Sequence, residues 1–290
     1  MDNLRGIGWM VLAMALFAIE DALIKQAAAD IPAGQILMLL GLGGGAFFAA
    51  IARLRGLRLL SPVLLSGPVM IRNLTEMIGT LGFVTAITTI PLSTASAVLQ
   101  ATPLVMTMGA ALIFAEPVGW RRWSAIGIGF AGVLVIIRPG LAGFDPYALF
   151  AVLGVLGLAG RDLAARAVPR AIPNVQLAAY GFLMLIPTGA VLLLFGAPWS
   201  PPTPDTWALI ALAVAVGVAG YYAITTASRT GDVSVVTPFR YSRLIFALLV
   251  GMTVFGERPD ALTYLGAVLV IGSGLYTFMR ERRVMTQSKR

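Results

Sequence analysis

Long apolar runs, separated by short polar or charged segments, occupy most of the sequence. A helix that rises about 1.5 Å per residue needs roughly 20 apolar residues to cross a bilayer core of about 30 Å. The runs do not alternate apolar and polar residues, as the strands of a membrane barrel would. We therefore predict an all-α integral membrane protein with ten transmembrane helices, at residues 7–27, 32–52, 69–88, 93–115, 122–138, 147–167, 174–195, 206–228, 233–256 and 260–279.

The pattern occurs twice along the chain. When the chain is shifted by 141 positions, the segment at residues 90–116 aligns with the segment at residues 231–257. The same shift aligns polar residues without a gap: Asp21 with Asp162, Lys25 with Arg166, Gln35 with Gln176, Ser93 with Ser234, and Glu116 with Glu257. We expect two homologous five-helix repeats, residues 1–140 and 141–290. Because each repeat crosses the membrane an odd number of times, the two have opposite orientations.

An inverted repeat is typical of carriers, in which the substrate site lies between the halves near the membrane midplane. Rocking of the halves then opens the site to each side in turn, which is alternating access. The alternative is that duplication is only an economical way to build a membrane bundle. The repeat therefore favours transport without naming a substrate.

Composition excludes several other classes of protein. Only 12% of the residues are charged, against about 25% in a soluble domain. The chain has no cysteine and no histidine, which removes disulfides, thiol chemistry, the usual proton shuttle and the commonest transition-metal ligand. It also has no paired carboxylates at metal-like spacing and no glycine-rich phosphate loop. We expect neither an enzyme nor a bound metal or cofactor.

The basic residues indicate an orientation. With the N-terminus inside, most of the 21 Lys and Arg residues fall on the inner side, whereas Lys25, Arg138 and Arg258 fall on the outer side. Positive residues favour the cytoplasmic side, so both termini are expected in the cytoplasm. The net charge of +8 then reflects topology rather than nucleic-acid binding. These features suit a multi-pass protein of a bacterial inner membrane, as a monomer or homodimer in contact with lipid.

The sequence resembles the EamA-like branch of the drug/metabolite transporter superfamily. The resemblance is carried by I-P-L-S-T-A-S-A at residues 90–97, Pro103, Glu116 and the glycine-rich fifth helix. A weaker copy in the second half contains Ser234, Glu257, Gly266 and Gly272. Residues 238–241 read Pro-Phe-Arg-Tyr where residues 97–100 read Ala-Val-Leu-Gln, so the halves have diverged at this point.

This resemblance covers nearly the whole chain and implies both a fold and a class of function. It implies ten helices with cytoplasmic termini, and a central cavity lined mainly by the first, third, fourth, sixth, eighth and ninth helices. The fifth and tenth helices would lie at the periphery. It also implies transport of small metabolites, including amino acids and their analogues, often as efflux.

Ionisable side chains deep in a transmembrane helix are costly and usually face a partner or a wet cavity. Glu20 and Asp21 in the first helix either pair with Lys25 near the outer surface or have a function. Since Asp21 aligns with Asp162, a structural pair with Lys25 or Arg166 in its own half is expected for it. Glu20, which aligns with Arg161, is the better functional candidate.

Other candidates lie in later helices. Arg72 and Glu76, four residues apart, share a helix face and can neutralise each other. Arg240 and Arg243 have no acid close by on their own helix. Their partner is either a substrate carboxylate or phosphate, which suits a guanidinium, or one of Glu20, Glu76 and Asp21. Adding nearby aromatic and polar residues, the candidate substrate-binding residues are Glu20, Arg72, Glu76, Gln100, Thr102, Arg161, Tyr221, Tyr222, Arg240, Tyr241 and Arg243. Glu20 and Glu76 are the candidates for proton coupling.

Two hypotheses for the substrate remain open. The first is a secondary carrier for an amino acid or related carboxylate, with export as one of its directions. The second is a carrier for a larger nucleotide- or cofactor-like solute such as S-adenosylmethionine, riboflavin or a nucleotide sugar, since aromatic stacking and Arg–phosphate contacts would serve it as well. A channel is disfavoured because the charged positions form no ring or filter motif.

Overall fold

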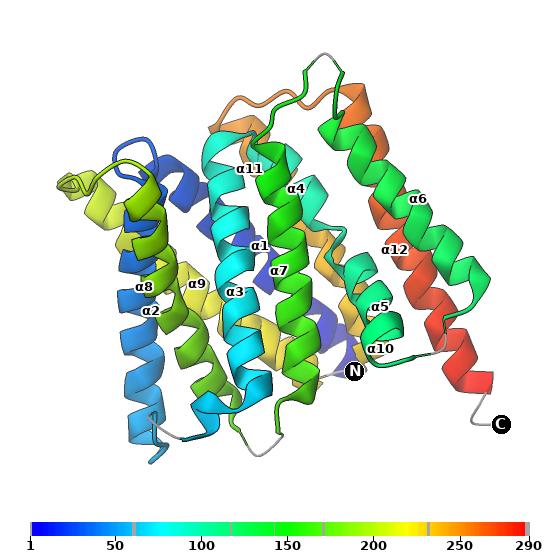
Figure 1. Ribbon diagram of the computed structural model, residues 1–290, viewed down its shortest axis with the longest axis horizontal. Coiled ribbons are helices and arrows are strands. Elements are labelled where there is room, and N and C mark those ends of the chain that lie inside the picture. Colours follow the sequence, from blue (N-terminus) through cyan, green and yellow to red (C-terminus); the bar gives the residue numbers. More distant parts are fainter. Residues whose placement is uncertain are drawn as a thin grey trace.

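The computed structural model describes residues 2–59, 62–116, 118–141, 143–169, 172–230 and 233–287, and these residues form helices joined by short loops (Figure 1). The helices are α1 (Asp2–Ala27), α2 (Ala33–Leu54), η1 (Pro62–Leu65), α3 (Gly67–Thr89), α4 (Leu92–Leu99), α5 (Thr102–Ile113), α6 (Trp120–Ile137), α7 (Ala148–Ala167), α8 (Asn174–Phe195), α9 (Pro204–Thr230), α10 (Val233–Val236), η2 (Thr237–Tyr241), α11 (Ser242–Val254) and α12 (Ala261–Gln287). Arg170, Asp232, Lys289 and Arg290 lie outside the described residues.

The all-α membrane fold is confirmed. Eight helical stretches of the described chain are long and apolar enough to cross a membrane, with α4 and α5 taken together as one stretch. Two further spans complete the ten: α3, which contains Arg72 and Glu76, and the interrupted segment α10–η2–α11. Large apolar side chains such as Leu74, Leu194 and Val268 are more than half exposed, as expected where helices face lipid.

Helix packing follows the sequence repeat. α1 packs against α9, and α3 packs against α7. Because α1 is equivalent to α7 and α3 is equivalent to α9 in the repeat, these two contacts are equivalent to each other. α2 packs against its equivalent α8 on one flank, and α6 packs against its equivalent α12 on the other (Figure 1). The two predicted inverted five-helix repeats are therefore confirmed.

Polar ties between the halves repeat in the same way. Gln35 at the start of α2 donates its amide N–H to the carbonyl of Ser200 over 2.7 Å. The equivalent Gln176 at the start of α8 donates to the carbonyl of Arg58 over 2.6 Å. Each half thus holds a loop of the other through the same residue type at the same repeat position.

Glycine allows two of the helix pairs to approach closely. A Cβ on Gly132 in α6 would lie 2.8 Å from the carbonyl oxygen of Gly266 in α12, and a Cβ on Gly79 in α3 would lie 2.6 Å from the backbone nitrogen of Leu158 in α7. Both distances are shorter than a van der Waals contact, so any side chain would push the helices apart. This close backbone packing is typical of membrane helix pairs.

The fourth and ninth transmembrane segments, predicted as single helices, are each interrupted. The first stops at Gln100 and Ala101 between α4 and α5, and the second is interrupted by η2. Pro103 and Pro238 follow or lie in these interruptions, and proline lacks the N–H that a continuous helix needs. The hydroxyl of Thr102 donates to the free carbonyl of Leu99 over 2.6 Å instead. Shifted back by 141 positions, η2 falls on residues 96–100, so the two interruptions overlap at Gln100 and Tyr241.

The beginning of α1 and the end of α12 lie at the same edge of the molecule (Figure 1). We call this edge the termini side, and the opposite edge, where α1 ends and α4 begins, the far side.

Candidate functional site

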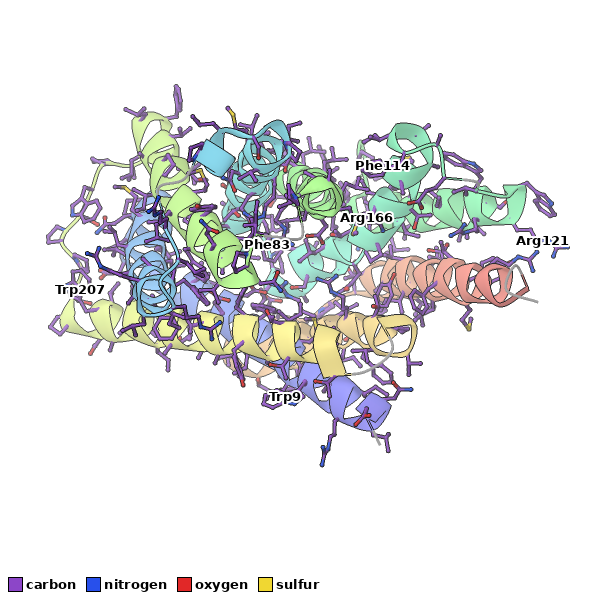
Figure 2. All side chains as sticks on the ribbon, turned by 90° about the horizontal axis from the view of Figure 1, so that it is seen from below. Trp9, Phe83, Phe114, Arg121, Arg166 and Trp207 are labelled. Atoms are coloured by element: carbon purple, nitrogen blue, oxygen red, sulfur yellow. The ribbon has the colours of Figure 1, made fainter. Side chains whose placement is uncertain are left out.

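An ion pair between the halves lies inside the bundle. Arg243, in the first turn of α11, donates to one oxygen of Asp21 in α1 from Nη2 over 2.6 Å and from Nε over 3.2 Å. The guanidinium also lies over the rings of Phe17 and Phe83, at 5.5 and 5.2 Å. Phe83 points into the interior among the helices (Figure 2). The expected pairing of Asp21 within its own half is therefore wrong: its partner belongs to the second half.

A second cluster joins α3 to α7. Glu76 accepts from Arg72 in its own helix over 3.1 Å and from Arg161 in the other half over 3.1 Å. Arg161 also holds Asp162 over 2.8 Å. The local Arg72–Glu76 pair expected from the sequence is present. Because both oxygens of Glu76 are occupied, this carboxylate serves mainly to bridge the two halves.

Two charged residues among the candidates from the sequence, Glu20 and Arg240, are not part of these ion pairs. Glu20 has neither a hydrogen bond nor an ion pair to any residue in the described part of the chain, although it interacts electrostatically with Asp21 and Arg243. Its carboxylate lies against Gly217 of α9, in the space that a Cβ there would fill. Arg240 likewise has no hydrogen bond or ion pair among the described residues, and it interacts electrostatically with Asp162 and Tyr241.

The two tyrosines of α9 point in different directions. Tyr221 interacts electrostatically with the α3–α7 cluster, and its hydroxyl donates to the carbonyl of Asn174 over 3.1 Å. Tyr222 is 64% exposed and packs edge-on against Trp9, which lies at the surface of the bundle (Figure 2). The structure brings Tyr221 to the charged cluster and leaves Tyr222 outside it.

Gln100, Arg240 and Tyr241 line a cavity of about 60 Å³ at the two helix interruptions. The cavity is completed by Gly274 and Thr277 of α12, a helix that the family resemblance places at the periphery. Thr102, predicted with them, is not among the lining residues, and its hydroxyl donates to the carbonyl of Leu99.

The ends of the fourth and ninth segments have the same backbone turn. Ala115 and Gly256 both have positive φ angles, 53° and 62°. The following backbone N–H, of Glu116 or Glu257, reaches back six residues to a carbonyl, over 3.3 and 3.0 Å. The local structure is therefore the same in both halves.

The side chains after these turns have different environments. On the far side, Glu257 accepts from the backbone N–H groups of Leu92 and Ser93, at 2.6 and 2.9 Å, and so caps α4. It also lies 4.0 Å from Lys25, and only 9% of its side chain is exposed. On the termini side, Glu116 meets Arg166 at 3.2 Å with 46% of its side chain exposed. In this conformation the far side is tied together more tightly than the termini side.

Two carboxylates in the loops are held ionised by hydrogen bonds. The pKa of Asp260 is lowered to about 2, first by its hydrogen bond from Arg138 and then by the backbone N–H and hydroxyl of Thr263. The pKa of Asp30 is lowered by hydrogen bonds from Thr206 and Thr203. Asp30 thereby joins the loop before α2 to the start of α9 in the other half.

Sequence reasoning missed three contributors to the site. Asp162 was treated as structural, although it shares Arg161 with Glu76. Gly217, which receives the Glu20 carboxylate, and Phe83, which lies under Arg243, were not considered. The repeat could have pointed to Gly217. The shift of 141 positions aligns Gly217 with Glu76 and Glu20 with Arg161, so the contact of Glu20 with Gly217 is equivalent to that of Arg161 with Glu76.

Two inverted five-helix repeats, joined in the interior by Asp21–Arg243 and Glu76–Arg161, define a membrane carrier of the inverted-repeat class. The sequence profile of the EamA-like transporter family matches residues 4–138 and 145–279. The chain therefore belongs to the EamA-like transporter family, which confirms the resemblance seen in the sequence. The protein is a multi-pass membrane transporter, not an enzyme.

Relatives in several bacteria have names that specify a transported solute. A riboflavin transporter of Rhizobium johnstonii is 29% identical over 216 residues, covering 73% of this chain and 71% of the relative. An S-adenosylmethionine uptake transporter of Rickettsia prowazekii is 25% identical over 292 residues, covering 98% and 95%. The pseudopaline exporter CntI of Pseudomonas aeruginosa is 26% identical over 272 residues, covering 92% and 93%.

The fold also matches a solved structure. One crystal structure superimposes with a TM-score of 0.60 at 21% sequence identity, covering 94% of this chain and 96% of the other. At this identity the match supports the fold alone.

Proposed function

We propose that the protein is an alternating-access carrier for a small zwitterionic metabolite, an amino acid or a related carboxylate. The observation that carries this proposal is the charge inventory of the bundle interior. Among the described residues there, Asp21, Arg72, Glu76, Arg161, Asp162 and Arg243 are in ion pairs with one another. Two more, the acidic Glu20 and the basic Arg240, have no ion pair within the described chain.

An unpaired charge in a low-dielectric interior is unfavourable. A solute with one carboxylate and one cationic group supplies a partner for both Glu20 and Arg240. A simple anion or cation leaves one of them unpaired. The charge inventory therefore favours a zwitterion over a singly charged solute.

The alternative is a larger nucleotide- or cofactor-like solute. Two relatives are named for S-adenosylmethionine and riboflavin, and Tyr221 with Phe17 and Phe83 supplies aromatic surface near the charges. S-adenosylmethionine contains an amino acid group, so the same charged residues would serve it. Riboflavin has no such group and would not use both charges.

The two ends of the bundle support alternating access. Equivalent glutamates follow the same backbone turn, yet the side chain of Glu257 is 9% exposed and caps α4, while that of Glu116 is 46% exposed. We place the termini side in the cytoplasm from the distribution of Lys and Arg, in a bacterial inner membrane. In this assignment the conformation is sealed toward the outside. We also propose that the boundary between the two repeats in the sequence lies near residue 140.

Proton coupling, if the carrier uses it, is assigned to Glu20 rather than Glu76. Glu76 accepts from two guanidinium groups, one of them from the other half, so a change at this carboxylate would disturb a contact between the halves. Glu20 lacks such donors among the described residues, so it can exchange a proton with less disruption of the bundle.

A thermal-shift experiment on the detergent-purified protein tests the substrate class. A ligand that binds the folded state raises its apparent stability. We expect stabilisation by one or more L-amino acids or S-adenosylmethionine, and none by the corresponding methyl esters or decarboxylated amines. Glu20→Gln and Arg240→Gln should each remove the shift, and the lipid-exposed Tyr222→Phe should retain it. Stabilisation by an ester equal to that by its parent acid would contradict the proposal.

A further inference from the structure

The cavity at the two helix interruptions has an unusual chemical lining. It lies between η2, the first turn of α5 and α12, and its volume is about 60 Å³. Each interruption contributes the residue at the same repeat position, Gln100 from the first half and Tyr241 from the second. Equivalent positions of the two halves thus contribute two different polar side chains to the same cavity.

Both of these polar groups lack a partner. The side-chain nitrogen of Gln100 and the hydroxyl of Tyr241 are buried and have no hydrogen bond among the described residues. Gln100 is 6% exposed and Tyr241 8% exposed, so bulk water does not satisfy them. Buried polar groups are nearly always hydrogen-bonded, which makes two orphaned donors beside one cavity a sign of a missing acceptor.

The remaining polar features of the cavity favour an anion. Arg240 is one of its lining residues. The guanidinium of Arg240 has no ion pair among the described residues and has donors only. Pro103 and Leu104, in the first turn of α5, form another wall. The N-terminal end of a helix has a partial positive charge, and interrupted membrane helices use such ends to hold anionic groups of substrates.

The size of the cavity suits a small group. A cavity of about 60 Å³ has room for more than one water molecule, and so for a group as small as a carboxylate. Tyr241 limits it on one side, because its hydroxyl occupies the place where a Cβ on Gly274 would lie.

We propose that this cavity is the subsite for the carboxylate of the transported solute. The guanidinium of Arg240, the hydroxyl of Tyr241 and the amide N–H of Gln100 donate to the carboxylate oxygens. The proposal rests on the proposed function and deepens it, since it separates a carboxylate subsite at the interruptions from the cationic partner of Glu20. It also gives α12 a direct part in binding.

Acetate is the probe for this subsite, and acetamide is its uncharged counterpart. The melting temperature of the purified protein is measured against each compound at constant ionic strength, held with chloride. We expect acetate to raise the melting temperature and acetamide to have no effect. Tyr241→Phe, Arg240→Gln and Gly274→Ala should each weaken acetate binding by about tenfold or more, as loss of a charge-assisted hydrogen bond does.

Two controls keep this test specific. Gly272→Ala changes the same helix at a position where a Cβ meets nothing within 4 Å, and it should retain the acetate response. Tyr241→Phe removes a hydroxyl that has no partner in the ligand-free protein, so it should fold at least as well as the wild type. No acetate response in the wild type, or an equal response in Tyr241→Phe, would overturn the subsite.

Transport separates this inference from the proposed function. If Tyr241→Phe transports an amino acid with an unchanged KM, the carboxylate subsite is wrong and the carrier proposal stands. If Tyr241→Phe raises KM for an amino acid while Gly272→Ala leaves it unchanged, the subsite is supported.

Discussion

At the scale of single residues, the adjacent carboxylates Glu20 and Asp21 of α1 have different surroundings. Asp21 is paired with Arg243 at 2.6 Å, with 6% of its side chain exposed, whereas Glu20 lies against Gly217. Removing one member of a buried pair leaves the other charge uncompensated, which costs about 3–5 kcal/mol. We expect Asp21→Asn to destabilise the protein by that order, and Glu20→Gln to leave stability unchanged or raise it while abolishing transport.

Unfolding in mixed micelles together with transport measurements tests this prediction. Glu20→Gln is the matched control for Asp21→Asn, since both changes neutralise a carboxylate within one turn. Equal loss of stability in the two variants would show that Glu20 has a structural partner.

The left-handed residues after the fourth and ninth segments provide a second prediction. Ala115 has φ of 53° and its equivalent Gly256 has φ of 62°. An L-residue in this conformation costs about 1–2 kcal/mol relative to glycine. Ala115→Gly should therefore stabilise the protein by about 1 kcal/mol and Gly256→Ala should destabilise it by a similar amount. A stability loss in Ala115→Gly, measured by chemical unfolding, would contradict this reading of the turn.

At the scale of elements, the cap on α4 should control access from the far side. Glu257 folds back over Gly251, where a Cβ would lie 2.6 Å from its carboxylate. Both Gly251→Ala and Glu257→Gln should loosen the cap and expose the start of α4. Ala95 is fully buried in α4, and the chain has no cysteine, so Ala95→Cys gives a single labelling site.

The rate of maleimide labelling at Ala95→Cys is the measurement for this cap. We expect labelling about tenfold faster in Glu257→Gln, because a charge-assisted cap contributes about 1.5 kcal/mol or more. Glu116→Gln, the equivalent change on the termini side, should leave the rate unchanged. Equal rates in wild type and Glu257→Gln would show that the cap does not close this end.

The pairing of α6 with α12 should depend on pH. Asp260 caps α12 and is bonded to Arg138 at the end of α6, and its pKa is lowered from 3.8 to about 2. A lowered pKa gives stability that is present above the ordinary value and is lost as the pH falls toward 2.

Hydrogen exchange at the first turn of α12 tests this pH dependence. We expect protection to decrease between pH 4 and 2, since those are the two pKa values of Asp260. Asp260→Asn retains a side chain that can cap the helix, and it should remove the pH dependence that is specific to this turn. The same decrease in wild type and Asp260→Asn would assign it to other carboxylates.

At the scale of the whole molecule, the pattern of apolar runs and the shift of 141 positions predicted ten spans and two inverted repeats. Apolar runs and an internal repeat recur along the chain, so both can be recognised in a single sequence. The two helix interruptions were missed, because the apolar pattern continues through Gln100 and through η2 while the backbone hydrogen bonds do not. A proline inside an apolar run was the available signal.

The site was predicted less completely than the fold. Arg72–Glu76 was predictable because both residues lie in one helix at a spacing of four. Asp21–Arg243 joins residues 222 positions apart, and only the packing of α1 against α11 selects that pair over Lys25 or Arg166. Tyr221 and Tyr222 are adjacent in sequence, and a change of 100° around the helix places one near charges and the other toward lipid.

Counterflow in proteoliposomes tests whether the two halves carry a zwitterion between them. Vesicles are loaded with unlabelled solute and diluted into a trace of the labelled form, with L-amino acids, S-adenosylmethionine and riboflavin as the panel. We predict transient accumulation of a solute that has both a carboxylate and a cationic group, with none in Arg240→Gln. Accumulation of riboflavin alone, or of no solute in the panel, would contradict the account.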